Sequence, residues 1–132
     1  MPLRLKLKPQ ERAIIGGAAI QNGRSRTEIF IENEVPVLRE QDIMSPAAVR
    51  TPCERIYLAL QLMYVDPSHA ADHAALFLSM FEDVADAAPS CQPHLDLIAH
   101  CAREGRLYQA LKNAKTLLVY EQELLGHVQK RA

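Results

Sequence analysis

The spacing of the apolar residues changes about a third of the way along the chain, and this change constrains the fold. In residues 3–8 leucine alternates with arginine or lysine, which is the period of two of a β-strand. From about residue 46 apolar residues recur every three or four positions, which is the period of an α-helix. The sequence therefore predicts an α+β fold. A small antiparallel β module of about five strands (1–45) precedes a bundle of about four helices (46–132).

Turn signals divide the first region into strands. Asn22-Gly23 favours the positive φ angles of a two-residue hairpin, and Gly16-Gly17 indicates a bulge or bend. Residues 27–32 are rich in β-branched and aromatic side chains, as is typical of a strand. A last short strand, 35–38, contains Pro36, which cannot donate to a ladder, so we expect this strand at an edge or a bulge.

Capping signals divide the second region into helices. Thr51 and Glu54 have the spacing of a capping box with proline between them, and Ser68 is a good N-cap. Pro89 and Gly105 are expected to end the helices that precede them. The predicted helices span residues 52–64, 68–87, 92–104 and 106–129.

The last predicted helix carries a heptad-like apolar seam that Glu121 interrupts. Its members are Leu107, Leu111, Ala114, Leu118, Leu125 and Val128. The other helices can cover this seam within the chain. Alternatively, because a buried unpaired carboxylate is costly, the part after Glu121 projects and binds a partner helix. The candidate partner-binding residues are Leu118, Leu125 and Val128.

Composition excludes several classes of protein. Apolar residues make up 48% of the 132, enough for a core, and no stretch approaches the length of a membrane span. Three cysteines without a Cys-x-x-Cys pair are typical of reduced cytosolic thiols. No nucleotide-binding loop is present. We expect a cytoplasmic protein that needs no cofactor and is not an enzyme.

Histidines offer weak candidates for a metal site. His69 and His73 are four residues apart and would share a helix face, but no third ligand has a convincing spacing. His94, His100 and Cys101 meet the same objection. Surface histidines are the better interpretation, and we expect no metal.

The cations Arg4, Lys6 and Lys8 are the strongest candidates for a binding surface. Their spacing of two places them on one face of the first strand, where they can follow the phosphates of a single strand of nucleic acid. The alternative is an edge strand whose charges prevent aggregation. No tryptophan is present, and Phe30 is the one aromatic residue of this region that could stack on a base.

Three segments of the chain resemble the FlbT family of flagellar regulators. They are residues 2–9, Asn22-Gly23 and residues 37–44, and the resemblance continues through residues 51–64. It implies binding to the 5′ untranslated region of flagellin messenger RNA, with repressed translation or message decay. It also implies action alongside FlaF, a small helical flagellar protein. No membrane and no small-molecule substrate are implied.

The β module also resembles the RNA-binding regulators of the CsrA type, which are strand-exchanged dimers. This resemblance rests on the order of five strands and on residues 35–40. Two departures are Leu38, where that family has histidine, and Pro36 in the last strand. The implied RNA contacts are Leu5, Lys6 and Lys8 of the first strand and Arg39 of the last. Glu40 is expected to orient the Arg39 guanidinium toward a phosphate or a guanine edge.

Two hypotheses follow for the function of the chain. In the first, the β module binds the flagellin messenger RNA leader through Arg4, Leu5, Lys6, Lys8, Arg39 and Glu40. The helices then supply either homodimer contacts or a docking surface. In the second, the chain is a helical adaptor for flagellar assembly. It then binds FlaF or flagellin through its seam and the Phe77/Phe81 stripe, without direct RNA contact.

Overall fold

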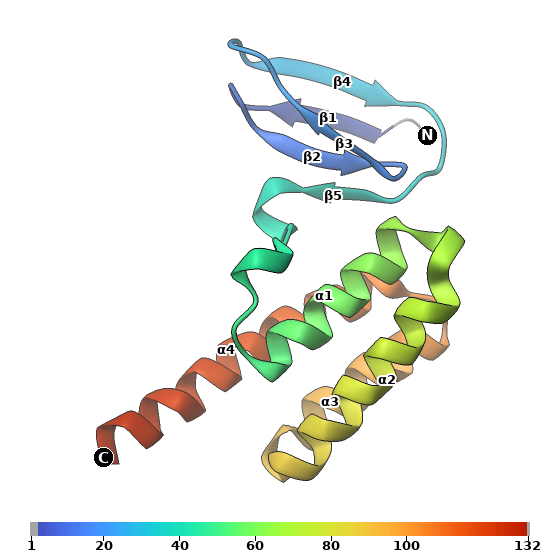
Figure 1. Ribbon diagram of the computed structural model, residues 1–132. Helices are drawn as coiled ribbons and strands as arrows, with labels where there is room; N and C mark the ends of the chain where they lie inside the picture. Colours follow the sequence, from blue (N-terminus) through green and yellow to red (C-terminus); the bar gives the residue numbers. More distant parts are fainter. Residues whose placement is uncertain (1–2, 132) are drawn as a thin grey trace. The chain divides into compact units, whose positions relative to one another are not determined.

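The computed structural model describes residues 3–131, and for residues 127–131 the backbone alone (Figure 1). It divides the chain into two compact units, Met1–Ile43 and Met44–Ala132. The first holds five antiparallel strands and the second holds the helices, so the predicted α+β class is confirmed.

The β unit contains two small sheets. Strand β1 (Leu3–Leu7) pairs with β4 (Thr27–Ile31) and places Lys6 opposite Glu28. In the other sheet β2 (Arg12–Ile15) lies between β3 (Ala18–Gln21) and β5 (Val37–Arg39). The leucine alternation of β1 has the predicted consequence, because Leu5 and Leu7 are buried while Lys6 is exposed.

The two-residue hairpin turn lies at Gly16-Gly17, and the expectation for Asn22-Gly23 was wrong. Both residues of the Gly16-Gly17 pair have positive φ, +58° and +86°, as the turn that joins β2 to β3 requires. The chain around Asn22 instead crosses from one sheet to the other. Pro36 precedes β5, and its carbonyl accepts a hydrogen bond from the Gly16 amide, so it removes no donor from that strand.

The helices match the predicted ranges closely. They are α1 (Pro52–Val65), α2 (Ala70–Ala87), α3 (Gln92–Arg103) and α4 (Leu107–Arg131). The predicted capping box is present, because Thr51 Oγ1 accepts from the Glu54 amide and Glu54 accepts from the Thr51 amide. The expectation that Ser68 caps the second helix was wrong, because α2 begins after the 3₁₀ turn η3 (Pro67–His69). The Ser68 hydroxyl instead donates a hydrogen bond to Asp66.

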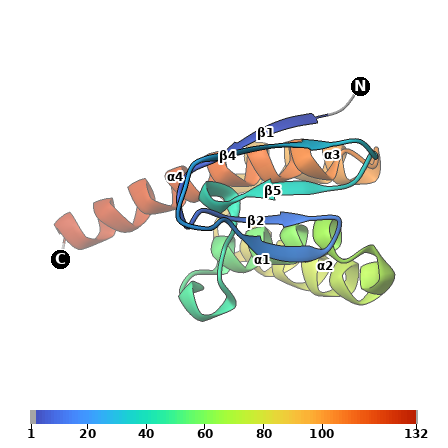
Figure 2. The ribbon, with the colours of Figure 1, turned by 90° about the horizontal axis from the view of Figure 1, so that it is seen from above.

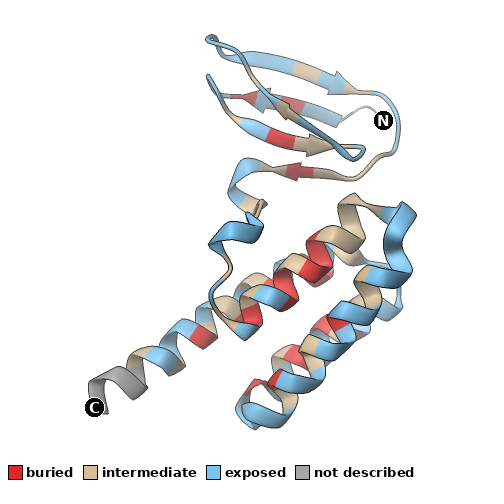
Figure 3. Ribbon diagram, viewed as in Figure 1, coloured by how far each residue is buried: buried red, intermediate tan, exposed pale blue. Residues whose placement is uncertain are grey.

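In the helical unit, α1 packs against α2 and α4, and α4 packs against α3 (Figures 1 and 2). Buried residues line the facing sides of these helices (Figure 3). No helix in the described part of the chain is long and apolar enough to cross a membrane.

The buried stripe of α4 differs from the predicted seam. Ala110, Leu111, Ala114 and Leu117 are buried, and Leu118 is half-buried. Glu121 continues the buried stripe and is only 9% exposed. Its Oε1 accepts from the Thr51 hydroxyl and its Oε2 from the Cys53 amide, 3.2 Å away.

The expectation that Glu121 interrupts the seam was therefore wrong. The carboxylate binds the first turn of α1, where amide groups lack partners within the helix. Leu125, one turn later, is 42% exposed. The side chain of Val128 lies outside the described residues.

A candidate nucleic-acid interface on the β unit

A basic concavity of about 450 Å³ lies on the β unit. Lys6 of β1 and Lys8 beyond it form one side, Arg26 and Glu28 another, and Arg39 at the end of β5 a third. Its lining includes four cations and one carboxylate, a balance of +3. Such a surface suits a polyanion, because a concave surface of one charge focuses the electrostatic field. The remaining lining residues are Leu7 and Thr27.

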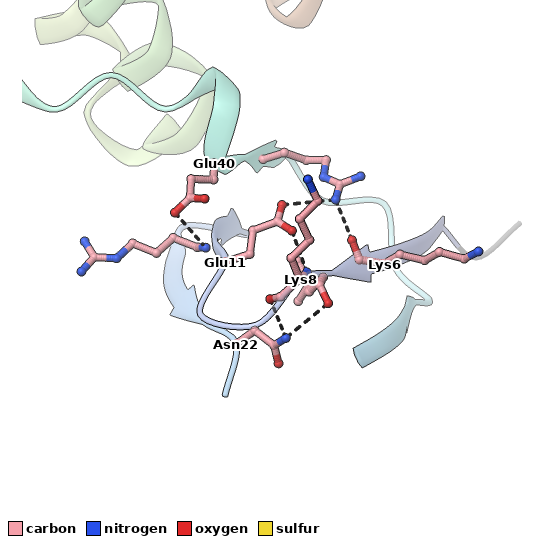
Figure 4. Close-up of polar contacts among 8 residues, drawn as sticks. Lys6, Lys8, Glu11, Asn22 and Glu40 are labelled. Atoms are coloured by element: carbon pink, nitrogen blue, oxygen red, sulfur yellow. Dashed lines mark hydrogen bonds and ion pairs between the residues drawn. The ribbon is translucent and has the colours of Figure 1, made fainter. Parts of the chain in front are cut away.

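Arg39 is held in place from two directions, and both contacts lie within the β unit. Its Nη2 donates to the Lys6 carbonyl at 2.6 Å and to Glu11 Oε2 at 3.2 Å (Figure 4). Lys6 belongs to one sheet and Arg39 to the other, so this guanidinium ties the two sheets together. Such a position fixes the cation, which lowers the entropy lost when it binds a phosphate.

Glu11 orients the guanidinium, and the expectation that Glu40 does so was wrong. Glu11 Oε1 accepts from the Lys8 amide at 2.8 Å, while Oε2 binds Arg39. The Lys8 hydrogen bond and the Arg39 charge together lower the pKa of Glu11. Glu40 lies in the 3₁₀ turn η1 (Glu40–Asp42), where its carboxylate accepts from the Arg12 amide at 3.4 Å. It does not line the concavity.

Asn22 fixes the loop that carries Arg26. Its Nδ2 donates to the carbonyls of Lys8 and Ser25, at 2.8 and 2.9 Å, and also lies 3.3 Å from the Leu7 carbonyl (Figure 4). Gln10, with φ of +64°, donates its amide to the Gly23 carbonyl on the same loop. These bonds connect the segment after β1 to the loop before β4, so the two sides of the concavity are joined through the Asn22 side chain and one backbone hydrogen bond.

The residues predicted from sequence for RNA binding divide into three groups. Lys6, Lys8 and Arg39 come together in the concavity. Arg4 lies on the same face of β1, outside the concavity, and pairs with Glu28 at 3.2 Å. The Leu5 side chain is buried, so this side chain belongs to the core and not to a contact surface.

Sequence reasoning missed Arg26 and left the position of Phe30 open. Arg24 and Arg26 both follow Asn22-Gly23, but a tight hairpin at that dipeptide would have pointed them away from the first strand. In the structure Arg26 faces the concavity and Arg24 does not line it. Phe30 lies opposite Arg4 in the register and is 58% exposed, so its ring is available beside the cations.

His69 and His73 both contact the same carboxylate. His69 Nδ1 and His73 Nε2 lie 3.1 and 3.0 Å from Asp66 Oδ2. Hydrogen bonds from His73 and Ser68 lower the pKa of Asp66 to about 2. Among the described residues, no group of three or more His, Cys, Asp or Glu side chains is arranged so that it could hold a metal ion.

Comparison with known proteins places the chain among flagellar proteins. Residues 3–125 match the family model described as flagellar protein FlbT. The probable flagellum biosynthesis repressor protein FlbT 1 of Bradyrhizobium diazoefficiens is 41% identical over 96% of this chain and 86% of its own length. The protein named flagellum biosynthesis repressor protein FlbT in Caulobacter vibrioides is 39% identical over 97% and 92%. No solved structure matches the chain.

Proposed function

We propose that this chain, which belongs to the FlbT family of flagellar proteins, represses flagellum biosynthesis by binding the 5′ untranslated region of flagellin messenger RNA. The relatives compared above are named flagellum biosynthesis repressors, and this chain aligns with most of the length of each. The proposed consequence of binding is reduced translation or faster decay of the message.

The basic concavity is the observation that supports RNA as the ligand. Lys6, Lys8 and Arg26 are exposed around it, and Arg39 is fixed at its edge. Neutralising phosphates releases condensed counterions, so even a few such cations contribute strongly to affinity at low salt. Exposed Phe30 adds a ring on which a base can stack.

We further propose that the chain acts by binding and not by catalysis. Burial, followed by the carboxylate of Glu121, raises the pKa of the Cys53 thiol far above its ordinary value. A protonated thiol is a poor nucleophile, so this cysteine does not suit covalent catalysis. A cytoplasmic location, a FlaF-like partner and a homodimer stay predictions from the sequence.

Two neighbouring arginines provide a matched test of the RNA proposal. Arg24 and Arg26 are both exposed and two residues apart, but Arg26 alone of the two lines the concavity. Affinity for flagellin leader RNA is measured by fluorescence anisotropy over salt concentrations from about 50 to about 200 mM, where phosphate contacts change it strongly. We expect Arg26→Ala to reduce the salt slope by about one unit and Lys6→Ala/Lys8→Ala by about two.

Arg24→Ala is expected to leave the salt slope unchanged. Circular dichroism of each variant establishes that the fold is intact. Equal effects of Arg24→Ala and Arg26→Ala would mean that general charge, and not the concavity, attracts RNA. Unchanged affinity of the Lys6→Ala/Lys8→Ala variant at low salt would assign these cations to protection of the strand edge.

A further inference from the structure

An apolar groove of about 330 Å³ lies in the helical unit, among residues of α1, α2, α4 and the segment before α3. Its apolar lining includes Val84 and Ala87 of α2, Cys91, and Leu124 and Leu125 of α4. The volume is at the lower end of the range for ligand pockets, about 300–1,000 Å³, and suits a few aliphatic or aromatic side chains.

Two carboxylates line this groove, and they differ in availability. Glu121 is buried and bonded to Thr51 and Cys53, as described above. The carboxylate of Asp83 is exposed and makes no hydrogen bond or ion pair with another side chain or backbone group in the described part of the chain. An occupant of the groove therefore meets apolar side chains in the middle and one free negative charge at the edge.

The α2 side of the groove is negatively charged, whereas two exposed arginines, Arg50 and Arg55, flank Pro52 and Cys53 on the α1 side. No lysine or arginine occurs from Ile56 to Ala102, a segment that includes most of α1 and all but the last residue of α3. The same segment contains six carboxylates, at positions 66, 72, 82, 83, 86 and 96. Three of them, Glu82, Asp83 and Asp86, are exposed in the last two turns of α2. This charge disfavours RNA or an anionic membrane as the occupant and favours a cation.

The apolar lining on α4 is partly exposed. Leu125 is 42% exposed, although it lies one turn from the buried Glu121 and next to Leu124. The lining offers few polar groups that could orient a small molecule, because Glu121 already has its partners. An amphipathic helix needs only an apolar surface and charges at its rim.

We propose that this groove binds an amphipathic helix of a partner protein, with an apolar stripe over Val84, Ala87 and Leu125 and a lysine or arginine beside Asp83. The stripe excludes water from the groove, and the cation fixes the orientation of the helix. This interaction is independent of the basic concavity, so either can fail without the other.

A designed peptide tests the groove without knowledge of the natural partner. The probe is a fluorescent peptide of about 18 residues with leucines at helical spacing and lysines on either side, which matches the apolar face of a surface helix. Its control has the same composition with the leucines spread around the helix. Binding to the full chain is measured by fluorescence anisotropy, with thermal melts to establish that each variant is folded.

Two pairs of variants distinguish binding in the groove from nonspecific electrostatic or hydrophobic binding. Asp83→Lys and Asp86→Lys make the same change of charge on α2, but only Asp83 lines the groove. Leu125→Glu and Val119→Glu both replace exposed apolar residues of α4, and only Leu125 lines it. We expect Asp83→Lys and Leu125→Glu to weaken binding of the amphipathic peptide at least tenfold. Asp86→Lys and Val119→Glu should change binding less than twofold.

Several results would overturn the proposal. Equal binding of the two peptides, or equal effects within either pair of variants, would show that the groove is not the site. A dimer of the unmodified chain that dissociates in Leu125→Glu, seen by analytical ultracentrifugation, would make a second copy the occupant. An apolar molecule that co-purifies with the unmodified chain, but not with Leu125→Glu, would make the groove a ligand pocket.

Discussion

Replacing Glu121 by alanine tests whether a carboxylate of α4 stabilises the start of α1. Glu121 lies about seventy residues from Thr51 and Cys53 in sequence, yet it accepts hydrogen bonds from both. It also places a negative charge at the amino end of a helix, where the backbone dipole favours one. The alanine variant loses both bonds and leaves the Cys53 amide without this partner.

The expected loss of stability follows from these contacts. Hydrogen bonds to a charged group are worth about 1.5–3 kcal/mol each, but the two share one carboxylate and are not additive. A charge at a helix terminus adds about 0.3–1 kcal/mol. We therefore expect Glu121→Ala to lower the free energy of unfolding by about 3 kcal/mol. For a unit of this size the midpoint of thermal unfolding falls by roughly 12–24 °C.

Thermal and urea unfolding followed by circular dichroism measure this loss. Glu123→Ala is the matched control, because Glu123 is an exposed glutamate of the same helix, and its expected change is within about 0.5 kcal/mol. Glu121→Gln, which keeps the shape and an acceptor oxygen, should fall between the two. If Glu121→Ala is as stable as Glu123→Ala, the carboxylate contributes nothing net, and its desolvation offsets its hydrogen bonds.

Two further predictions concern titration and metal content. The folded pKa of Glu11 is lowered, so its stabilising effect is complete above the ordinary value of 4.5 and is lost as the pH falls through the folded pKa. Urea unfolding at about pH 6 and about pH 3 should therefore show a smaller acid loss of stability for Glu11→Gln than for the unmodified chain. An equal loss would mean that the contacts of Glu11 with the Lys8 amide and Arg39 add no pH-dependent stability. Elemental analysis of the purified protein should find no stoichiometric zinc, because no group of three side chains among the described residues could hold a metal ion. One zinc per chain, removed by His73→Ala, would contradict this.

Local signals made the ends of the helices predictable from sequence. Thr51 and Glu54 form the capping box that their spacing indicates, and Gly105, with φ of +76°, follows α3 as expected. In the β unit, two dipeptides six residues apart, Gly16-Gly17 and Asn22-Gly23, could each form the hairpin turn. The strand pairing places the hairpin at Gly16-Gly17. The pairings of β1 with β4 and of β2 with β5 join distant segments, and a local pattern does not show them.

The buried face of α4 was not predictable from its spacing. Leu117-Leu118 and Leu124-Leu125 are adjacent pairs, so helical stripes of two different phases fit the sequence. Glu121 interrupts the predicted seam, and because unpaired buried charges are costly, the part of the helix after it was expected to project. That argument failed because the partners of Glu121 lie on α1, far away in sequence.

The cationic site was predictable in part. The alternation of residues 3–8 placed Lys6 and Lys8 on one face, and the family resemblance added Arg39. The position of Arg26 could not be predicted, because the course of residues 22–27 depends on the pairing of β4 with β1. Whether these residues bind RNA stays a prediction, and the Arg24/Arg26 comparison decides it.

The net charge of the chain does not reveal the two proposed binding surfaces, because they have opposite charges. The whole chain has a formal charge of −1, which by itself argues against a polyanion as ligand. Yet the concavity on the β unit has a balance of +3, and residues 56–102 of the helical unit contribute six carboxylates and no cation. Screening over about 8–10 Å at physiological salt means that a ligand responds to the nearest charges and not to the sum. One chain can therefore attract RNA to one unit and a cationic helix to the other.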